Sequence, residues 1–308
     1  MTAMRTGFLA ILTPSYERAD RLPKLYESLC RQSDPDFVWV VADDGSTDGT
    51  GRLIRGWQEE GRLDIEYLFK ENGGKHTALA LGIRRIAALG AQLTFIVDSD
   101  DWLTEDAVAS IRAMQGREWT SERRIGGFCF LRRGSDGTIN GGAFPQDIMT
   151  GNYTELRINR GDLGDKAEVY DTRVLEEYPF PCFGEERFLP EDAVWIRMAA
   201  RYDMVFVNQA IYYCDYLEGG LTRSGRRMKL HSPCGMMYRS AGYLENPRVN
   251  RRTRLKMLLL WHIYHSFAVK NGMDAETERL CAVRKNFWFY LLLLPGRLLG
   301  LVWKWKYA

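Results

Sequence analysis

Three carboxylates stand within four residues, at Asp98, Asp100 and Asp101, directly after the apolar run 93–97. Carboxylates crowded in this way repel one another and raise each other's pKa unless a cation compensates their charge. A hard divalent cation such as Mg²⁺ or Mn²⁺ binds oxygen ligands and often bridges one or two carboxylates to the phosphates of a substrate. The segment therefore predicts a metal site; the alternative is that the acids only cap the helix that follows.

Polar side chains also follow two earlier apolar runs, at residues 8–13 and 37–42. The β-branched and aromatic residues of these runs, like those of 93–97, predict buried strands. The polar segments that follow are 14–18 and 43–46. In a parallel sheet the carboxyl ends of the strands share one edge, so we expect these segments and the three acids to converge on one crevice.

Strands and helices alternate over the first hundred residues, which predicts an α/β fold with a mostly parallel sheet and right-handed crossovers. The expected helices occupy residues 21–32, 46–57, 75–89 and 104–114, and a further strand occupies 65–69. Beyond them we expect strands at 126–131, 204–207 and 210–214, a hairpin turn at 136–137 and an amphipathic helix at 191–201. The sheet domain is expected to end near residue 222, and the remainder is expected to be helical.

The two parts of the chain differ strongly in charge. Residues 223–308 contain 17 Lys and Arg against 4 Asp and Glu, whereas residues 1–222 contain 25 against 36, although the net charge is only +2. A basic segment of this kind typically meets phosphate groups, of a nucleic acid or of an anionic membrane surface. The alternative is a basic face that is only solvated.

The final segment, 286–308, is strongly apolar and aromatic. We expect Pro295 to interrupt it and to leave two segments, each too short to cross the roughly 30 Å core of a bilayer. Aromatic side chains beside Lys304 and Lys306 suit the interface of an anionic membrane. We therefore expect an anionic membrane surface as a partner, and no nucleic acid; the alternative is a helix packed on its own domain or on a partner subunit.

The cysteines and the N-terminus bear on the cellular compartment. The six cysteines are widely spaced and form no Cys-x-x-Cys pair, and the apolar run 8–12 is too short for the hydrophobic region of a signal peptide. We therefore expect reduced thiols and a cytoplasmic protein, held peripherally on the inner face of the cell membrane.

Four segments together resemble, in order and spacing, the motifs of the family 2 inverting glycosyltransferases of the GT-A fold. They read TPSYERAD at 13–20, VADDGSTD at 41–48, NGGKH at 72–76 and DSDD at 98–101. The resemblance covers about residues 6–222 and implies a Rossmann-like, mostly parallel sheet flanked by helices. The C-terminal helical extension, 223–308, lies outside it.

The resemblance implies a site for a nucleotide diphosphate sugar, with uridine diphosphate as the expected carrier. Pro14, Tyr16 and Asp44 would line the nucleoside pocket, and Asp44 would accept a hydrogen bond from the uracil imide. Lys75 would meet the base or the diphosphate, and Mg²⁺ or Mn²⁺ held by the acids at 98–101 would help to neutralise the leaving diphosphate. The donor-binding residues expected from these motifs are Pro14, Tyr16, Glu17, Asp43, Asp44, Lys75, Asp98, Ser99 and Asp100. Two positions depart from the family, because Glu17 stands where Asn is common and Leu79-Ala80 where many members have Arg-Asn.

Inversion needs a base that deprotonates the acceptor hydroxyl while it attacks from the face opposite the diphosphate. Family members place an acidic pair at the start of a helix that carries Trp-x-Arg, and here that helix reads PEDAVWIR at 190–197. Alignment on Trp195 and Arg197 makes Glu191 the base, whereas alignment on the acidic pair makes it Asp192. Helix phase favours Glu191. The alternative is that both acids only stabilise the helix N-terminus.

The resemblance implies a metal-dependent hexosyltransferase that moves a sugar to a saccharide or lipid-linked saccharide acceptor in bacterial surface polysaccharide synthesis. One alternative is a catalytically inactive protein that keeps the fold as a nucleotide-binding or scaffold module. The carboxylates at 98–101 and 191–192 speak against that alternative. A nucleotidyltransferase is a second alternative, but residues 13–20 lack the glycine- and basic-rich phosphate loop that it requires.

Overall fold

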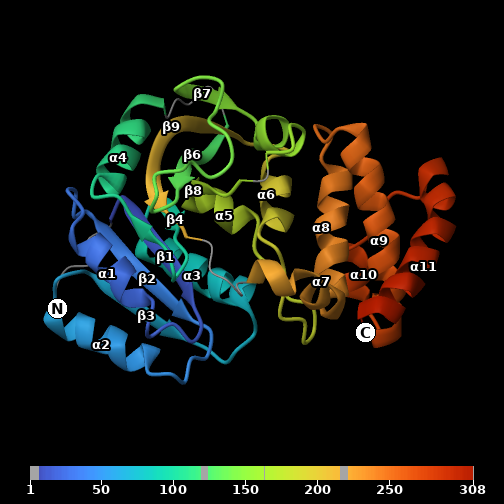
Figure 1. Ribbon diagram of the computed structural model, residues 1–308, viewed down its shortest axis with the longest axis horizontal. Helices are drawn as coiled ribbons and strands as arrows, with labels where there is room; N and C mark the ends of the chain where they lie inside the picture. Colours follow the sequence, from blue (N-terminus) through green and yellow to red (C-terminus); the bar gives the residue numbers. More distant parts are fainter. Residues whose placement is uncertain (1–6, 119–123, 163, 216–220, 308) are drawn as a thin grey trace.

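A central β-sheet with helices on both faces forms one part of the molecule, and a group of helices stacks against one end of it (Figure 1). The computed structural model describes residues 7–118, 124–162, 164–215 and 221–307. The strands are β1 (Leu9–Ser15), β2 (Phe37–Asp43), β3 (Ile65–Phe69), β4 (Leu93–Ile96), β5 (Trp102–Leu103), β6 (Ile125–Arg133), β7 (Ile148–Gly151), β8 (Lys166–Asp171) and β9 (Asp203–Tyr213). The helices are α1 (Leu22–Cys30), α2 (Thr50–Glu60), α3 (Lys75–Leu89), α4 (Ala107–Glu118), α5 (Thr172–Glu177), α6 (Asp192–Met198), α7 (Leu221–His231), α8 (Pro233–Glu245), α9 (Arg251–Asn271), α10 (Ala275–Leu280) and α11 (Phe287–Tyr307), with a short π-helical turn at Thr154–Ile158.

The first four strands form the parallel part of the sheet. The strand order is β3-β2-β1-β4-β8-β6-β9-β5, and β7 pairs with β9. Neighbours among β1 to β4 are parallel, whereas β8 is antiparallel to both β4 and β6. Strands β6 and β9 are parallel, and β5 and β7 are antiparallel to β9. The expected α/β fold is confirmed, and beyond β4 the sheet is mixed.

The two faces of the sheet bury two different sets of apolar side chains. On β1, Leu9 and Ile11 pack with α1, α2 and α4, while Leu12 packs on the opposite face with α3. This alternation is the period of two that a strand buried on both faces requires. The second core continues through α6 into the helical extension, where it includes Met237 and Trp261. The sheet and the extension therefore share one core, and the boundary near residue 222 stays a prediction.

Strand β9 differs from the two strands expected at 204–207 and 210–214, because it is continuous. Its pairing with β6 runs from Phe130 opposite Val207 directly to Leu131 opposite Ala210, so two residues of β9 bulge out of the register. One of them, Asn208, bonds with its side chain to the backbone of Phe144. The break expected between two strands is therefore a bulge within one strand.

Helix α4 begins at Ala107, later than expected. Residues 102–103 form β5 and pair with the end of β9, and Thr104 Oγ1 donates to Asp106 Oδ1 at 2.6 Å. The acids at 98–101 are therefore separated from α4 by a strand and a turn. They do not cap this helix.

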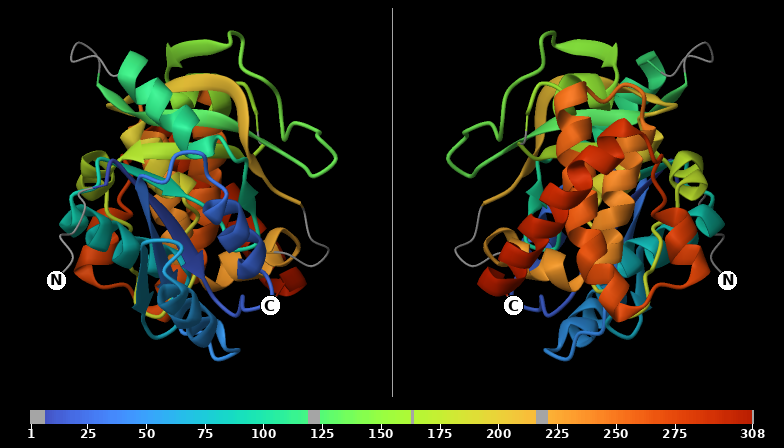
Figure 2. Two further views of the ribbon diagram at one scale, coloured as in Figure 1. Left: turned by 90° about the vertical axis from the view of Figure 1, so that its left-hand side faces the viewer. Right: turned by 90° about the vertical axis from the view of Figure 1, so that its right-hand side faces the viewer.

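Helix α11 is unbroken, so the expected interruption at Pro295 is wrong. Gly296 and Gly300 let the helix lie close to α9: a Cβ on them would come within 2.4 Å of His262 Cβ and 2.6 Å of Ser266 Oγ, respectively. This packing stabilises the helix across the proline. Within the described ranges, α11 is the one helix long and apolar enough to cross a membrane, and 17% of its apolar window is buried. Figure 2 shows α11 on the outer side of the helical group.

Candidate functional site

The polar segments predicted to converge do meet at one edge of the sheet. The register places Ser15 beside Asp43, and Asp43 beside Phe69, so β1, β2 and β3 end level with one another. Strand β4 pairs Ile96 with Leu12, and the chain then enters the acidic segment that begins at Asp98. The carboxyl ends of the parallel strands thus bring together side chains from four different segments.

Asp43 and Glu17 hold loops together at this edge. Asp43 accepts hydrogen bonds from the Ser46 amide at 2.8 Å and from the Tyr67 hydroxyl at 2.7 Å, and it is fully buried. Glu17 Oε1 accepts from the Thr47 amide at 2.8 Å, while the Glu17 amide donates to Ser46 Oγ at 2.9 Å. Both carboxylates therefore fix the loop after β2, and the departure at Glu17 has a local structural purpose.

Asp44 is also engaged within the protein. One carboxylate oxygen accepts from Lys70 Nζ at 2.6 Å and from the Gly73 amide at 2.9 Å, and the other accepts from the Gly74 amide at 2.7 Å. The residue is only 3% exposed. In this state Asp44 organises the glycine turn before α3, and the predicted bond to a uracil imide would have to replace or add to these bonds.

Three further donor-site candidates lie on the same edge with different exposures. Tyr16 is 49% exposed, so its ring is free to stack on a ligand. Pro14 is buried within β1, and Ser99 is buried beside the partly exposed Asp98 and Asp100.

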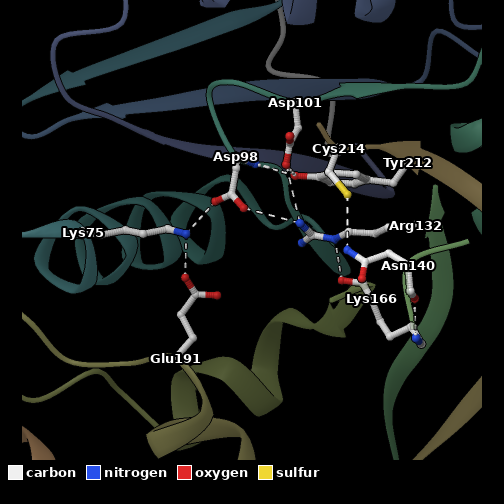
Figure 3. Close-up of polar contacts among 9 residues, drawn as sticks. All are labelled: Lys75, Asp98, Asp101, Arg132, Asn140, Lys166, Glu191, Tyr212 and Cys214. Atoms are coloured by element: carbon white, nitrogen blue, oxygen red, sulfur yellow. Dashed lines mark hydrogen bonds and ion pairs between the residues drawn. The ribbon is translucent and has the colours of Figure 1, made fainter. Parts of the chain in front are cut away.

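Lys75 stands between the donor edge and the start of α6 (Figure 3). Its Nζ lies 2.5 Å from Asp98 Oδ1 and 2.7 Å from Glu191 Oε1. Gly74 makes this approach possible, because its φ is +96° and a Cβ there would lie 2.0 Å from the carbonyl oxygen of Arg187. The segment that precedes α6 therefore packs directly on the first residue of α3.

These ion pairs change the pKa of both Lys75 and Asp98. Burial alone would lower the pKa of Lys75, but the negative charges of Asp98 and Glu191 raise it above its ordinary value. Burial alone would raise the pKa of Asp98, but the charges of Lys75 and Arg132 lower it to about 2. At neutral pH the lysine is therefore charged and Asp98 is ionised.

A second cation, Arg132 of β6, lies between two of the predicted metal ligands (Figure 3). Its Nη1 is 3.5 Å from both Asp98 Oδ2 and Asp101 Oδ2, and its guanidinium lies 3.9 Å from the ring centre of Tyr212. The Tyr212 hydroxyl donates to Asp101 Oδ2 at 2.7 Å and accepts from the Asp98 amide at 2.9 Å. Burial and the neighbouring Asp98 raise the pKa of Asp101 to about 7.

Glu191 and Asp192 face different parts of the protein. Asp192 accepts from Arg239 Nε at 2.7 Å and from the Tyr243 hydroxyl at 2.7 Å, and both partners belong to α8. Burial alone would raise the pKa of Asp192, but the charge of Arg239 lowers it. Glu191, by contrast, makes no side-chain cap to α6 and meets Lys75. The ring of Trp195 stacks on that of Tyr170, with the ring centres 4.4 Å apart. This contact fixes the phase of the short helix.

The residues present fit a divalent cation only in part. Within the described ranges, no group of three or more His, Cys, Asp or Glu side chains is arranged to hold a metal ion. Asp101 is buried and bonded to Tyr212, whereas Asp98 and Asp100 are partly exposed. Mg²⁺ and Mn²⁺ sites commonly use one or two carboxylates with substrate phosphates and water. The chain thus offers Asp98 and Asp100 for such a site, and a site with all three predicted ligands does not form in this arrangement.

Sequence reasoning missed three residues that shape the site. Arg132 and Tyr212 lie in strands and carry no motif, and Arg239 belongs to the helical extension. Only the order of strands in the sheet brings Arg132 and Tyr212 to the acidic segment. The one signal for Arg132 in the sequence was its position, because it is a basic residue directly after a predicted strand.

Comparison with known proteins relates the first part of the chain to a family. Residues 10–121 match the model for glycosyl transferase family 2. Glycosyltransferase GlyA of Streptococcus pneumoniae serotype 4 is 22% identical over 242 residues, which are 73% of this chain and 33% of GlyA. Poly(ribitol-phosphate) beta-N-acetylglucosaminyltransferase TarS of Staphylococcus aureus is 24% identical over 220 residues, which are 68% of this chain and 36% of TarS. The chain thus spans about a third of the length of these relatives.

Solved structures agree on the fold. Residues 1–349 of TarS in complex with UDP-GlcNAc superpose with a TM-score of 0.65 at 18% identity, covering 89% of this chain and 78% of the TarS chain. The mannosyltransferase PcManGT from Pyrobaculum calidifontis, in complex with GDP-Man and Mn²⁺, superposes with a TM-score of 0.53 at 16% identity, covering 96% of this chain and 81% of that one. Residues 10–121 thus match glycosyl transferase family 2, and the shared architecture shows that the chain has the GT-A fold.

Proposed function

We propose that this protein transfers a sugar, with inversion, from a uridine diphosphate sugar to a hydroxyl group of a saccharide acceptor. The observation that carries the proposal is the position of Lys75, whose Nζ joins Asp98 at the edge of the sheet to Glu191 before α6. A group suited to the diphosphate thus stands between the carboxylate expected at the donor and the carboxylate expected at the acceptor. The relatives support the choice of donor, because TarS is named as an N-acetylglucosaminyltransferase and has been solved with UDP-GlcNAc.

The donor would lie along the carboxyl ends of β1, β2 and β4. The exposed ring of Tyr16 offers a stacking surface for the base, and Lys75 offers a charged donor for the diphosphate. Asp98 and Asp100 would hold a divalent cation, which would supply charge stabilisation to the leaving diphosphate. PcManGT, which shares the fold, has been solved with Mn²⁺, and this supports the choice of cation.

Glu191 is the proposed general base. An acceptor hydroxyl would give its proton to Glu191 as its oxygen attacks the anomeric carbon, and the bond from that carbon to the diphosphate oxygen would break. Attack from the face opposite the leaving group inverts the anomeric centre. Asp192 does not suit this role in the observed geometry, because Arg239 and Tyr243 already use its carboxylate.

The bridge also implies an order of events at Lys75. Without a donor, the lysine is shared by Asp98 and Glu191. A bound diphosphate presents a higher negative charge than Glu191 and would compete for the same ammonium group. Donor binding would then free the Glu191 carboxylate to accept a proton, so that the base becomes active when the sugar is present.

We place the protein at the cytoplasmic face of a membrane, with a lipid-linked saccharide of surface polysaccharide synthesis as the acceptor. The outer side of α11 carries exposed apolar residues, among them Leu294 at 65% and Trp305 at 89% exposure. Lys304 and Lys306 add positive charge near its end. An apolar helix face with basic residues suits the interface of an anionic bilayer.

A donor screen tests the proposed activity. The full chain would be incubated with Mn²⁺ and with UDP, UDP-GlcNAc or GDP-mannose, and ligand-induced shifts of the melting temperature would be followed by assays for hydrolysis of each sugar nucleotide. We expect UDP and a UDP-sugar to stabilise the protein, and slow hydrolysis that is lost in Glu191→Gln. Tight nucleotide binding without turnover of any donor would instead indicate a binding module.

A further inference from the structure

A cavity of about 500 Å³ lies in the helical extension, away from the edge of the sheet. It is bounded by the end of α8, the first turns of α9 and the segment that leads into α11. All residues that line it come from positions 241–288, and no site residue named above is among them. A volume of this size is typical of small-molecule sites.

One wall of the cavity is apolar. Its side chains come from α8, α9, α11 and the segment before α11, and they are Leu244, Leu255, Leu258, Val283 and Trp288. Leu258 is 5% exposed and belongs to the apolar core that the sheet and the helical extension share, so packed side chains hold this wall in place. Such a surface offers little to a ligand made only of charged groups, but it can bury a hydrocarbon chain.

The other side of the cavity is basic. Arg254 is held in place because its guanidinium donates to the backbone carbonyls of Asn246 and Leu244. Arg251 and Arg284 are exposed and have no ion-pair or hydrogen-bond partner elsewhere in the described part of the chain. Glu245 is the one acid among the residues that line the cavity, and its Oε2 lies 3.7 Å from Arg197 Nε.

The start of α9 adds to the positive field at the cavity. This helix has 21 residues and no acidic residue in its first turn, and Arg251 and Arg254 belong to that turn. The amino end of a helix carries a partial positive charge and favours an anion. An anionic group at the cavity would therefore meet three arginines and the helix end together.

We propose that this cavity binds a membrane lipid through its phosphate headgroup. The arginines would contact the phosphate, and the first part of the hydrocarbon chain would lie on the leucines and Trp288. A free phosphate would leave the apolar wall unused, and a zwitterionic lipid would bring its own cation into the basic side. The membrane contact proposed for α11 supplies the source of the lipid, because Trp288 is in the first turn of that helix and is 41% exposed.

Soluble short-chain lipids test the site without a bilayer. Isothermal titration of the full chain would compare dihexanoyl phosphatidic acid with dihexanoyl phosphatidylcholine and with inorganic phosphate, each below its micelle concentration where one exists. We expect saturable binding of one phosphatidic acid per chain, at least tenfold tighter than the other two. Equal binding of the choline lipid would mean an apolar cavity only, and equal binding of phosphate would mean a simple anion site; either result would overturn the proposal.

A charge-matched pair of variants separates the cavity from the general basic surface. The double variant Arg251→Gln, Arg284→Gln should weaken phosphatidic acid binding at least tenfold. The control Arg252→Gln, Lys285→Gln removes two exposed neighbours that do not line the cavity, and it should change binding less than twofold. Equal losses in both variants would refute a defined site. Hydrolysis of the UDP-sugar, measured on the same samples, reports on the catalytic edge separately and should not change in either variant.

Discussion

Replacement of Glu191 by Gln tests the proposed chemistry most sharply, because the adjacent acid is a control supplied by the chain itself. Glutamine keeps the size of the side chain and a hydrogen bond to Lys75, but it cannot accept the acceptor proton. General base catalysis typically contributes about 10²- to 10⁴-fold in rate. We therefore expect kcat for transfer to fall by about 10²- to 10⁴-fold, which corresponds to about 3–5 kcal/mol of transition-state stabilisation.

The free energy of unfolding should change less in Glu191→Gln than in Asp192→Asn. Glu191 is partly exposed, and its side chain is 30% accessible, so Glu191→Gln should change the free energy of unfolding by less than about 1 kcal/mol. Asp192 neutralises Arg239, whose side chain is 19% accessible, and it accepts from Tyr243. Removal of one partner of a buried pair costs roughly 3–5 kcal/mol, and the partial exposure here reduces our expectation for Asp192→Asn to about 2–3 kcal/mol.

Both variants would be measured by urea unfolding and by steady-state kinetics at a temperature where each is folded. We expect Glu191→Gln to be stable and nearly inactive, with donor affinity close to that of the wild type. We expect Asp192→Asn to be destabilised and to keep most of its kcat. The reverse pattern, with an active Glu191→Gln and a stable but inactive Asp192→Asn, would refute the assignment of Glu191 as the base.

Other perturbations test the surroundings of the site. His76 is 2% exposed, and burial lowers its pKa to about 4. Between about pH 4 and 6.5, His76 therefore binds a proton in the unfolded chain but not in the folded protein. Urea unfolding should therefore show about 2 kcal/mol of stability lost between pH 7.5 and 5.0 that is absent in His76→Gln, and an identical pH profile in the variant would contradict this. Tyr212→Phe should cost about 1–3 kcal/mol in urea unfolding, because it removes the hydrogen bonds of the hydroxyl with the buried Asp101 carboxylate and the Asp98 amide, and unchanged stability would show that the hydroxyl is unimportant. The double variant Leu294→Ser, Leu301→Ser changes residues that are 65% and 64% exposed, so the fold should remain intact while co-sedimentation with anionic liposomes falls at least tenfold; undiminished pelleting would exclude α11 as the contact.

Local sequence patterns predicted the first half of the fold well. Strand β3 and helix α3 begin and end at the predicted residues, because each has a clear periodicity and glycine or polar residues at its ends. The bulge in β9 and the two-residue strand β5 were not predictable, since both depend on which strand lies alongside. The unbroken α11 likewise depends on close packing against α9, which the proline pattern alone does not reveal.

The candidate site was predictable as a set of strand ends and less so as a set of contacts. The spacing of the motifs correctly brought Asp44, Lys75 and Asp98 to one edge. It did not reveal that Asp44 is engaged by the glycine turn or that Arg132 lies beside Asp98, because these contacts arise between segments far apart in the chain. The choice between Glu191 and Asp192 likewise needed the helical extension, where Arg239 takes the second acid.

The central claim is that Lys75 stands between the donor diphosphate and the catalytic base, and a crystal structure of the protein with UDP and Mn²⁺ tests it most directly. We expect Lys75 Nζ within hydrogen-bond distance of a diphosphate oxygen, with its present 2.7 Å contact to Glu191 lengthened or lost. A diphosphate bound elsewhere, with Lys75 still joining Asp98 to Glu191, would contradict the claim.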